Sequence, residues 1–238
     1  MNKNILILQH ISVEDPGFIK DLMIKDKFNL KTVKLYQGQK IPENLKKYDA
    51  MFSMGGPMDT WMENKYSWLK DEKKAIYEYV VKLNKPFLGF CLGCQLLGEV
   101  LGGRVEKMKK NEIGILGLSM QNGYTSDALF QHFDPTIKVL QWHSYQVNNL
   151  NKVKVLASSN LCKYQAFRYK QHAYGIQFHL EAKNNTIKSW ASIPEYKKSL
   201  ENSLGPGSME KLENDTLTSL DIMNENAASM YQGFKLLL

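Results

Sequence analysis

Residues 89–95 read GFCLGCQ and contain two cysteines, Cys91 and Cys94, with a glycine two positions before the first and another two positions after it. The apolar residues 87–90 are typical of a buried strand, and residues 91–103 have the composition of a helix that ends at paired glycines. Cys91 is therefore predicted to stand between a strand and a helix. Open α/β sheets bind ligands at the carboxyl ends of their parallel strands, so this turn is a candidate functional site.

A strand-to-helix turn suits a nucleophilic thiol. The first N–H groups of a helix have no intrahelical partner and carry partial positive charge, which favours a thiolate. Gly89, Cys91 and Gly93 form the pattern Gly-x-Cys-x-Gly, the cysteine version of a nucleophile elbow, in which neighbouring backbone comes too close for a Cβ. The same turn aims the N–H of Leu92 at the space in front of the sulfur, which makes this group a candidate oxyanion donor.

Three other interpretations of the two thiols remain open. A redox Cys-x-x-Cys motif has the same local setting and would use Cys94 as well as Cys91, but it does not explain the glycines. A zinc site needs about four ligands, and apart from Cys162 the sequence offers only isolated histidines. Buried free cysteines are also common in protein cores. The sequence of residues 89–95 favours a nucleophilic cysteine, and no metal site is predicted.

A nucleophile of this kind needs a base, and the base needs a group that orients it. Residues 175–182 read GIQFHLEA and place His179 and Glu181 at the end of an apolar segment that predicts a strand. Side chains two positions apart on an extended segment project to the same side. Glu181 can then hold His179 in one tautomer while the other ring nitrogen faces Cys91. These three residues are the predicted catalytic triad.

A second glycine loop, SMGGPM at 53–58, follows another apolar run. Because this run also predicts a buried strand, the loop is expected at the same edge of the sheet as Cys91. Gly55-Gly56-Pro57 can expose a backbone N–H where a developing oxyanion would sit. As an isolated motif it is equally consistent with a simple turn.

The rest of the chain predicts one α/β domain. Apolar strands alternate with helical segments in the first part of the sequence, which favours a mostly parallel sheet with helices on both faces. The predicted strands are 4–9, 30–36, 48–54 and 87–90, and the predicted helices are 17–26, 64–83 and 91–103. Residues 104–178 look mainly β. We predict a flavodoxin-like three-layer fold with an added antiparallel β segment.

The last part of the sequence, about residues 184–238, predicts a helical extension of this single domain, 1–238. Pro194 and the GPG at 205–207 divide it into shorter helices. The final helix, over roughly 208–233, is amphipathic. Its candidate buried positions are Leu212, Leu217, Leu220, Met223 and Met230.

Composition narrows the class of protein. Hydrophobic residues make up 43% of the 238 residues, which is enough for a substantial core. The apolar runs are far shorter than the roughly 20 residues that span a bilayer, and the N-terminus lacks the pattern of a signal peptide, so a cytoplasmic protein without a membrane segment is expected. The net charge of +7 comes from scattered lysines rather than a basic stripe with aromatics, so no nucleic-acid partner is expected.

Taken together, Gly55-Gly56-Pro57, residues 89–95 and His179-Leu180-Glu181 resemble the class I (triad) glutamine amidotransferases in order and spacing. The chain is most similar to the stand-alone branch related to the amidotransferase domain of GMP synthase. That branch shares the LQH…VEDPG segment at 8–17 and a tryptophan-histidine pair at 142–143. It also has strands similar to YQAFRY at 164–169 and to the YGIQFH before Leu180.

The resemblance implies a mechanism that needs no cofactor. Cys91 attacks the γ-carbonyl of a glutamine-like group, and the N–H groups of Gly56 and Leu92 stabilise the oxyanion. His179, oriented by Glu181, protonates the leaving ammonia or amine and then activates water to hydrolyse the thioester. Cys94 has no implied role in the chemistry. The residues implied to bind the substrate are Gly55, Pro57, Gln95, His143, Ser144 and Tyr145.

One position departs from the family pattern. Relatives often carry an acidic residue two positions after the histidine of the tryptophan-histidine pair, where it helps to hold the α-ammonium of the substrate. Here the segment reads QWHSYQV and that position is Tyr145. A neutral phenol holds an ammonium less well than a carboxylate does. The γ-glutamyl chemistry is therefore better supported than free glutamine as the substrate.

The use of the released ammonia also stays open. The sequence has no Gly-x-x-x-x-Gly-Lys-Ser/Thr nucleotide loop that would mark a synthase domain. Two hypotheses follow for the γ-glutamyl substrate. The protein either works with a separate synthase subunit that receives ammonia, or hydrolyses a γ-glutamyl conjugate for its own sake, as γ-glutamyl peptidases of the same fold do. A thiol-disulfide protein that uses Cys91 and Cys94 is the alternative from another class.

Overall fold

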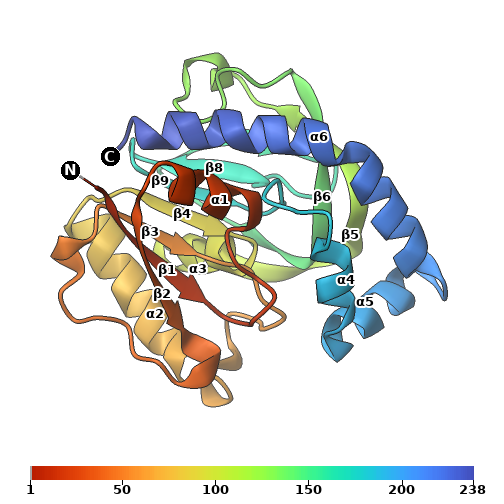
Figure 1. The fold of residues 1–238 in the computed structure, drawn as a ribbon, viewed down its shortest axis with the longest axis horizontal. Coiled ribbons are helices and arrows are strands. Elements are labelled where there is room, and N and C mark those ends of the chain that lie inside the picture. Colours follow the sequence, from red (N-terminus) through yellow and green to blue (C-terminus); the bar gives the residue numbers. More distant parts are fainter. Residues whose placement is uncertain (1) are drawn as a thin grey trace.

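A computed structural model describes residues 2–238 of the chain. Within these residues, one mixed sheet has the strand order β2-β1-β3-β4-β9-β8-β7-β5-β6 (Figure 1). Its first five strands in this order are parallel to one another. They are β2 (Asn29–Lys34), β1 (Asn4–Gln9), β3 (Ala50–Ser53), β4 (Phe87–Phe90) and β9 (Ala173–Ile176). This is the doubly wound order of flavodoxin-like folds, as the sequence predicted.

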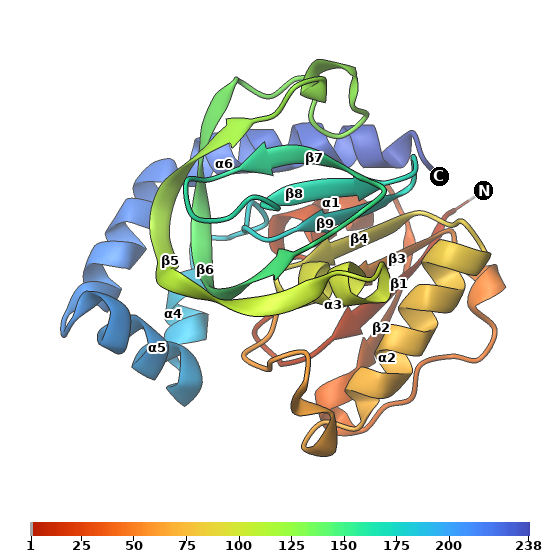
Figure 2. The same ribbon diagram turned by 180° about the vertical axis from the view of Figure 1, so that it is seen from behind.

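Helices cover both faces of the parallel strands. On one face lie α1 (Gly17–Lys25) and α6 (Ser208–Lys235), and on the other lie α2 (Trp68–Ile76) and α3 (Leu92–Val100) (Figures 1 and 2). Alternation along β1 explains the two layers, because Ile5 and Ile7 pack into the core under α1 and α6 while Leu6 and Leu8 pack under α2 and α3. The three-layer prediction is confirmed.

The remaining strands form the added antiparallel segment (Figure 2). They are β5 (Arg104–Met120), β6 (Thr136–Asn148), β7 (Val153–Ser158) and β8 (Ala166–Tyr169). The pairing of β5 with β6 shifts register between Lys107 and Glu112, and after the shift Glu112 stands opposite His143. This irregularity brings a carboxylate beside a histidine that was predicted to lie in the site.

The C-terminal segment is helical, as predicted. It consists of α4 (Thr186–Ala191), α5 (Pro194–Leu204) and α6, and Pro194 occupies the first turn of α5, where its missing N–H is tolerated. In α6 the predicted burial of Leu212, Met223 and Met230 is confirmed, and Leu220 is half-buried. The prediction for Leu217 was wrong, because this side chain is 43% exposed.

Helical geometry explains the error. Leu217 follows Leu212 by five positions, which turns it well away from the face that Leu212 presents to the core. Thr216, four positions after Leu212, takes the buried place and donates its hydroxyl to the Leu212 carbonyl at 2.7 Å. In residues 2–238, no helix combines the length and the apolar character that crossing a membrane requires.

Candidate active site

Cys91 stands at the tip of a sharp turn between β4, which ends at Phe90, and α3, which begins at Leu92. Its backbone has φ 47° and ψ −101°, a conformation that is strained for any residue with a Cβ. The turn is tight, since a Cβ on Gly89 would lie 2.5 Å from the carbonyl oxygen of Gly93. The nucleophile-elbow geometry predicted from the flanking glycines is therefore present.

The elbow is packed directly against the glycine loop after β3. A Cβ on Gly93 would lie 2.1 Å from the carbonyl oxygen of Ser53, and the Gly93 N–H donates to the Met54 carbonyl at 3.0 Å. Gly56, farther along the same loop, would place a Cβ 3.4 Å from the Leu92 side chain. The two predicted oxyanion donors, Gly56 and Leu92, are thus neighbours, and the Leu92 N–H belongs to the first turn of α3.

His179 and Glu181 follow β9 and form a buried pair. The His179 Nδ1 lies 2.6 Å from Glu181 Oε1, and the second carboxylate oxygen of Glu181 accepts the Leu180 N–H at 3.0 Å. The His179 backbone N–H donates to the Leu140 carbonyl at 2.9 Å, which ties this segment to β6. Because Nδ1 is occupied by the carboxylate, Nε2 is the ring nitrogen left for chemistry.

Glu181 is itself anchored by the start of α1. Its carbonyl oxygen accepts the Phe18 N–H at 2.8 Å, and a Cβ on Gly17 would lie 2.0 Å from the same oxygen. Gly17 has φ +48°, a conformation that favours glycine. The glycine at position 17 therefore lets α1 approach the segment that carries His179 and Glu181 closely.

Electrostatics join the histidine to the cysteine. Burial opposes a charge on His179, but the Glu181 carboxylate and hydrogen bonding to Cys91 outweigh it, and the pKa of His179 is raised well above its ordinary value of 6.5. Glu181 is paired with His179 Nδ1, and Cys91 is among the groups that raise the pKa of the ring. That these three residues act as a catalytic triad stays a prediction.

A pocket of about 140 Å³ opens in front of Cys91. Most of the residues predicted to bind substrate line it, together with several that the sequence did not indicate. The lining residues are Gly56, Pro57, Met58, Asp59, Cys91, Leu92, Gln95, Trp142, His143, Ser144, Tyr145, Glu195, Tyr196 and Ser199. Gly55 is not among them, and its carbonyl oxygen lies 3.0 Å from His10 Nδ1. A larger cavity of about 290 Å³ borders Glu181 but does not reach Cys91.

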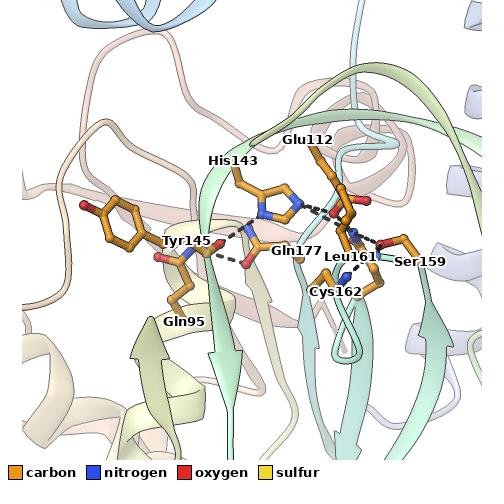
Figure 3. A network of polar contacts seen from close by, with 9 residues as sticks. Gln95, Glu112, His143, Tyr145, Ser159, Leu161, Cys162 and Gln177 are labelled. Carbon is orange, nitrogen blue, oxygen red and sulfur yellow. Dashed lines mark hydrogen bonds and ion pairs between the residues drawn. The ribbon is translucent and has the colours of Figure 1, made fainter. Parts of the chain in front are cut away.

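Gln95, His143 and Tyr145 belong to one polar network (Figure 3). The Gln95 amide donates to the Tyr145 carbonyl at 3.2 Å and to the Gln177 side chain at 3.1 Å. The same Tyr145 carbonyl lies 2.9 Å from His143 Nδ1, while His143 Nε2 lies 3.1 Å from Glu112 Oε2. Hydrogen bonding to His143 helps to lower the pKa of Glu112 although burial opposes it. The network fixes the backbone that forms one wall of the pocket.

The Tyr145 ring points away from this network (Figure 3). It packs edge-on against Trp61, with ring centroids 4.8 Å apart. Burial and the nearby Asp59 raise the pKa of Tyr145 above its ordinary value, so the phenol stays neutral near pH 7. The side chain at this position therefore supplies no negative charge to the pocket.

A family model described as "Glutamine amidotransferase class-I" matches residues 19–190. The chain belongs to this family. It is 33% identical over 171 residues to a subunit of the glutamine-hydrolyzing GMP synthase of Sulfurisphaera tokodaii, and the aligned part covers 71% of this chain and 86% of the relative. It is 29% identical over 175 residues to the putative glutamine amidotransferase-like protein YfeJ of Salmonella typhimurium, over 72% of this chain and 73% of that protein.

Solved structures extend the similarity to the C-terminal helices. The crystal structure of a glutamine amidotransferase from Thermotoga maritima superimposes with a TM-score of 0.87 at 27% identity and covers 98% of both chains. That of a glutamine amido transferase from Methylobacillus flagellatus has a TM-score of 0.88 at 22% identity, over all of this chain and 96% of the other, and supports the fold alone. The helical extension is thus part of the fold that this chain shares with these two structures.

Two residues that sequence analysis missed link this extension to the amidotransferase site. The Tyr196 hydroxyl, from α5, donates to the buried Glu14 carboxylate of the loop after β1. Burial raises the pKa of Glu14, and burial together with Glu14 raises that of Tyr196. Because these residues are 182 positions apart, no local pattern in the sequence could have paired them.

The other two cysteines of this family member are core residues. Cys94 is fully buried, and a Cβ on Gly175 of β9 would lie 3.0 Å from its sulfur. Burial raises the pKa of Cys94 well above the ordinary thiol value and that of Cys162 to about 12, so neither is a ready thiolate. All three cysteines are free thiols. Across residues 2–238, no group of three or more His, Cys, Asp or Glu side chains is arranged to hold a metal.

Proposed function

We propose that this amidotransferase-family protein hydrolyses a γ-glutamyl amide through a thioester on Cys91. The observation that carries the proposal is the setting of His179, whose Nδ1 lies 2.6 Å from Glu181 and whose pKa is raised in part by hydrogen bonding to Cys91, a residue that lines one pocket with Gly56 and Leu92. Nucleophile, base, orienting group and oxyanion donors are thereby assembled around one small space. Membership of the family supports the same reaction.

The first half of the reaction forms the thioester. The Cys91 thiolate attacks the γ-carbonyl carbon, and the carbonyl π electrons move to the oxygen, where the N–H groups of Gly56 and Leu92 stabilise the negative charge. Collapse of the tetrahedral intermediate breaks the C–N bond. His179, protonated as its raised pKa favours, gives its Nε2 proton to the leaving nitrogen, and ammonia or an amine departs.

The second half releases the acid. A water molecule loses a proton to the now neutral His179 and attacks the thioester carbonyl. The same oxyanion donors stabilise the second tetrahedral intermediate, and its collapse expels the Cys91 thiolate. Glu181 holds the ring through Nδ1, so that Nε2 faces the reacting atoms in both halves.

Pocket size and charge bear on the substrate. Sites for drug-sized ligands enclose about 300–1,000 Å³, so the cleft of about 140 Å³ suits an acyl group as small as a γ-glutamyl unit. Tyr145 gives no carboxylate for the α-ammonium, but Asp59 and Glu195 line the same pocket. Free glutamine is the first candidate substrate, and a γ-glutamyl peptide or amine is the second. The absence of negative charge on the Tyr145 side chain favours the second candidate.

We infer a partner protein only for the case in which free glutamine is the substrate. One relative, of 33% identity, is named as part of a GMP synthase, which supports the use of ammonia by a separate synthase protein. Hydrolysis of a γ-glutamyl conjugate would need no such partner. The activity of the isolated chain therefore separates the two cases.

A substrate panel tests the proposal. The purified protein is assayed for glutamate release from glutamine, γ-glutamyl peptides and γ-glutamyl amines, with Cys91→Ala as the inactive reference. We expect turnover of at least one γ-glutamyl compound that disappears in the variant. Release at equal rates by both proteins would show that Cys91 is not the nucleophile.

A further inference from the structure

His10 lies behind the glycine loop and plays no part in the reaction proposed above. It follows β1 directly, its side chain is fully buried, and its ring stacks on Trp68 with centroids 5.3 Å apart and an interplanar angle of 7°. Its two ring nitrogens both face acceptors. Nδ1 lies 3.0 Å from the Gly55 carbonyl oxygen, and Nε2 lies 2.9 Å and 3.0 Å from the two carboxylate oxygens of Glu72.

The acceptors define the state of the ring. The Gly55 carbonyl oxygen can only accept, so Nδ1 carries a proton and donates to it. Burial lowers the pKa of His10, but Glu72, and to a lesser extent Gly55 and Glu14, raise it above its ordinary value. Glu72 is fully buried on α2 and also accepts the Ser53 hydroxyl at 2.8 Å. Glu72 thus holds the ring through Nε2, and the ring holds the Gly55 carbonyl through Nδ1.

The contact with Gly55 fixes a peptide unit that the chemistry needs. The Gly55 carbonyl and the Gly56 N–H belong to one peptide group, and the structure has no cis peptide bonds in the residues it describes. In a trans peptide these two groups point in opposite directions. Gly56 lines the Cys91 pocket, whereas Gly55 and His10 do not, so turning the carbonyl to His10 turns the N–H toward the pocket.

Two glycines in a row make this peptide easy to flip, because neither residue has a Cβ that restricts its backbone. The surrounding residues nevertheless pack closely against both glycines. A Cβ on Gly56 would lie 3.0 Å from the His10 Cβ, and one on Gly55 would lie 2.3 Å from Glu14 Oε2. The loop therefore requires glycine at both positions and has to set the direction of the N–H by hydrogen bonding.

We propose that His10 is a positioning residue of the oxyanion hole, which acts by holding the Gly55 carbonyl so that the Gly56 N–H faces the carbonyl oxygen bound at Cys91. The inference rests on the proposed function, because it takes Gly56 as an oxyanion donor. Glu72 of α2 holds the His10 ring, and Ser53 of β3 donates its hydroxyl to Glu72. These two residues therefore act on the oxyanion hole through His10 and Gly55.

Two substitutions at the same position separate this role from a merely structural one. In His10→Asn the amide nitrogen occupies the place of Nδ1 and keeps the donor to Gly55, whereas in His10→Gln it occupies the place of Nε2 and keeps only the donor to Glu72. Both remove about the same part of the ring. We expect similar melting temperatures, but a kcat lower by roughly 10²-fold or more in His10→Gln and a much smaller loss in His10→Asn.

Two further measurements belong to the test. Alkylation of Cys91 by iodoacetamide involves no oxyanion, so both variants should react at the wild-type rate. Crystal structures of the variants should show the Gly55–Gly56 peptide rotated in His10→Gln and retained in His10→Asn. Equal losses of kcat in the two variants, or an unchanged peptide in His10→Gln, would overturn the proposal.

The crystal structures keep the two proposals distinguishable. A wild-type protein that releases glutamate from no γ-glutamyl compound would contradict the proposed function, yet the orientation of the peptide in the two variants would still decide whether His10 controls it. If both variants unfold, Glu72→Leu replaces them, because it keeps the His10 ring but removes the side chain that holds its Nε2. A crystal structure in which the ring has left Gly55 while the Gly55–Gly56 peptide keeps its wild-type orientation would then overturn the proposal.

Discussion

His179 Nδ1 lies 2.6 Å from Glu181 Oε1, and both side chains are almost completely buried. A pair of this kind leaves only Nε2 free to exchange protons with Cys91. The pair also couples protonation of His179 to folding. The pKa of His179 is raised well above 6.5 in the folded protein and returns to about 6.5 when the chain unfolds.

The first prediction concerns stability and pH. A raised histidine pKa stabilises the folded state fully below about pH 6.5, and this contribution is lost as pH rises through the folded-state pKa. Glu181→Gln removes the main group that raises it. We expect the difference in unfolding free energy between wild type and this variant to be larger at pH 6 than at pH 9.5, as measured by urea denaturation. A difference that grows with pH would contradict the assignment.

The second prediction concerns the glycine contact between the elbow and β3. Gly93→Ala would push a Cβ to within 2.1 Å of the Ser53 carbonyl, a backbone atom that cannot move aside cheaply. We expect a loss of about 1–3 kcal/mol in unfolding free energy and a fall in activity, because the turn that aims Cys91 must open. Gly117→Ala on β5, where nothing lies within 4 Å of the new Cβ, is the control. Equal effects at both positions would rule out the steric argument.

The third prediction concerns the two cysteines. Cys94→Ala should keep most of the hydrolytic activity, because its sulfur is buried toward β9 rather than the pocket, and should destabilise the fold by about 1 kcal/mol. Cys91→Ala should abolish hydrolysis with little change in melting temperature. The thiol-disulfide alternative makes the opposite prediction, that both thiols are required and that reductant changes the mass of the protein.

The fourth prediction concerns substrate choice. Tyr145→Asp adds a carboxylate to a wall of the pocket whose backbone is already fixed by His143 and Gln95. We expect the KM for glutamine to fall, because an ammonium is held better by a carboxylate than by a phenol, while a γ-glutamyl analogue without the α-amino group gains nothing. Steady-state kinetics on the two compounds provide the measurement. Tyr145→Asn, similar in shape but uncharged, is the matched control and should leave the ratio of the two KM values unchanged.

Local sequence signals predicted much of the fold and of the site. Apolar runs and glycines place Cys91 between β4 and α3, and the spacing of His179 and Glu181 predicts their pairing, because these features depend on neighbours in the chain. The error at Leu217 arose within such a local signal, since several apolar residues of α6 competed for one face and Thr216 occupies it.

Other parts of the site depend on contacts between distant segments. Glu14 with Tyr196, and His10 with Glu72, are pairs of polar residues that each look like ordinary surface positions in the sequence. Their burial follows from how α5 and α2 pack, which no spacing rule specifies. Gly55 was predicted to contact substrate, but it is not among the residues that line the pocket, and its carbonyl is hydrogen-bonded to His10 instead.

The most direct test of the central claim is the intact mass of the protein after brief incubation with a slowly hydrolysed γ-glutamyl ester, followed by peptide mapping. The proposed reaction predicts a γ-glutamyl adduct on Cys91 that builds up in the wild type, persists longer in His179→Asn and is absent in Cys91→Ala. An adduct on Cys94 or Cys162, or one that still forms in Cys91→Ala, would contradict it.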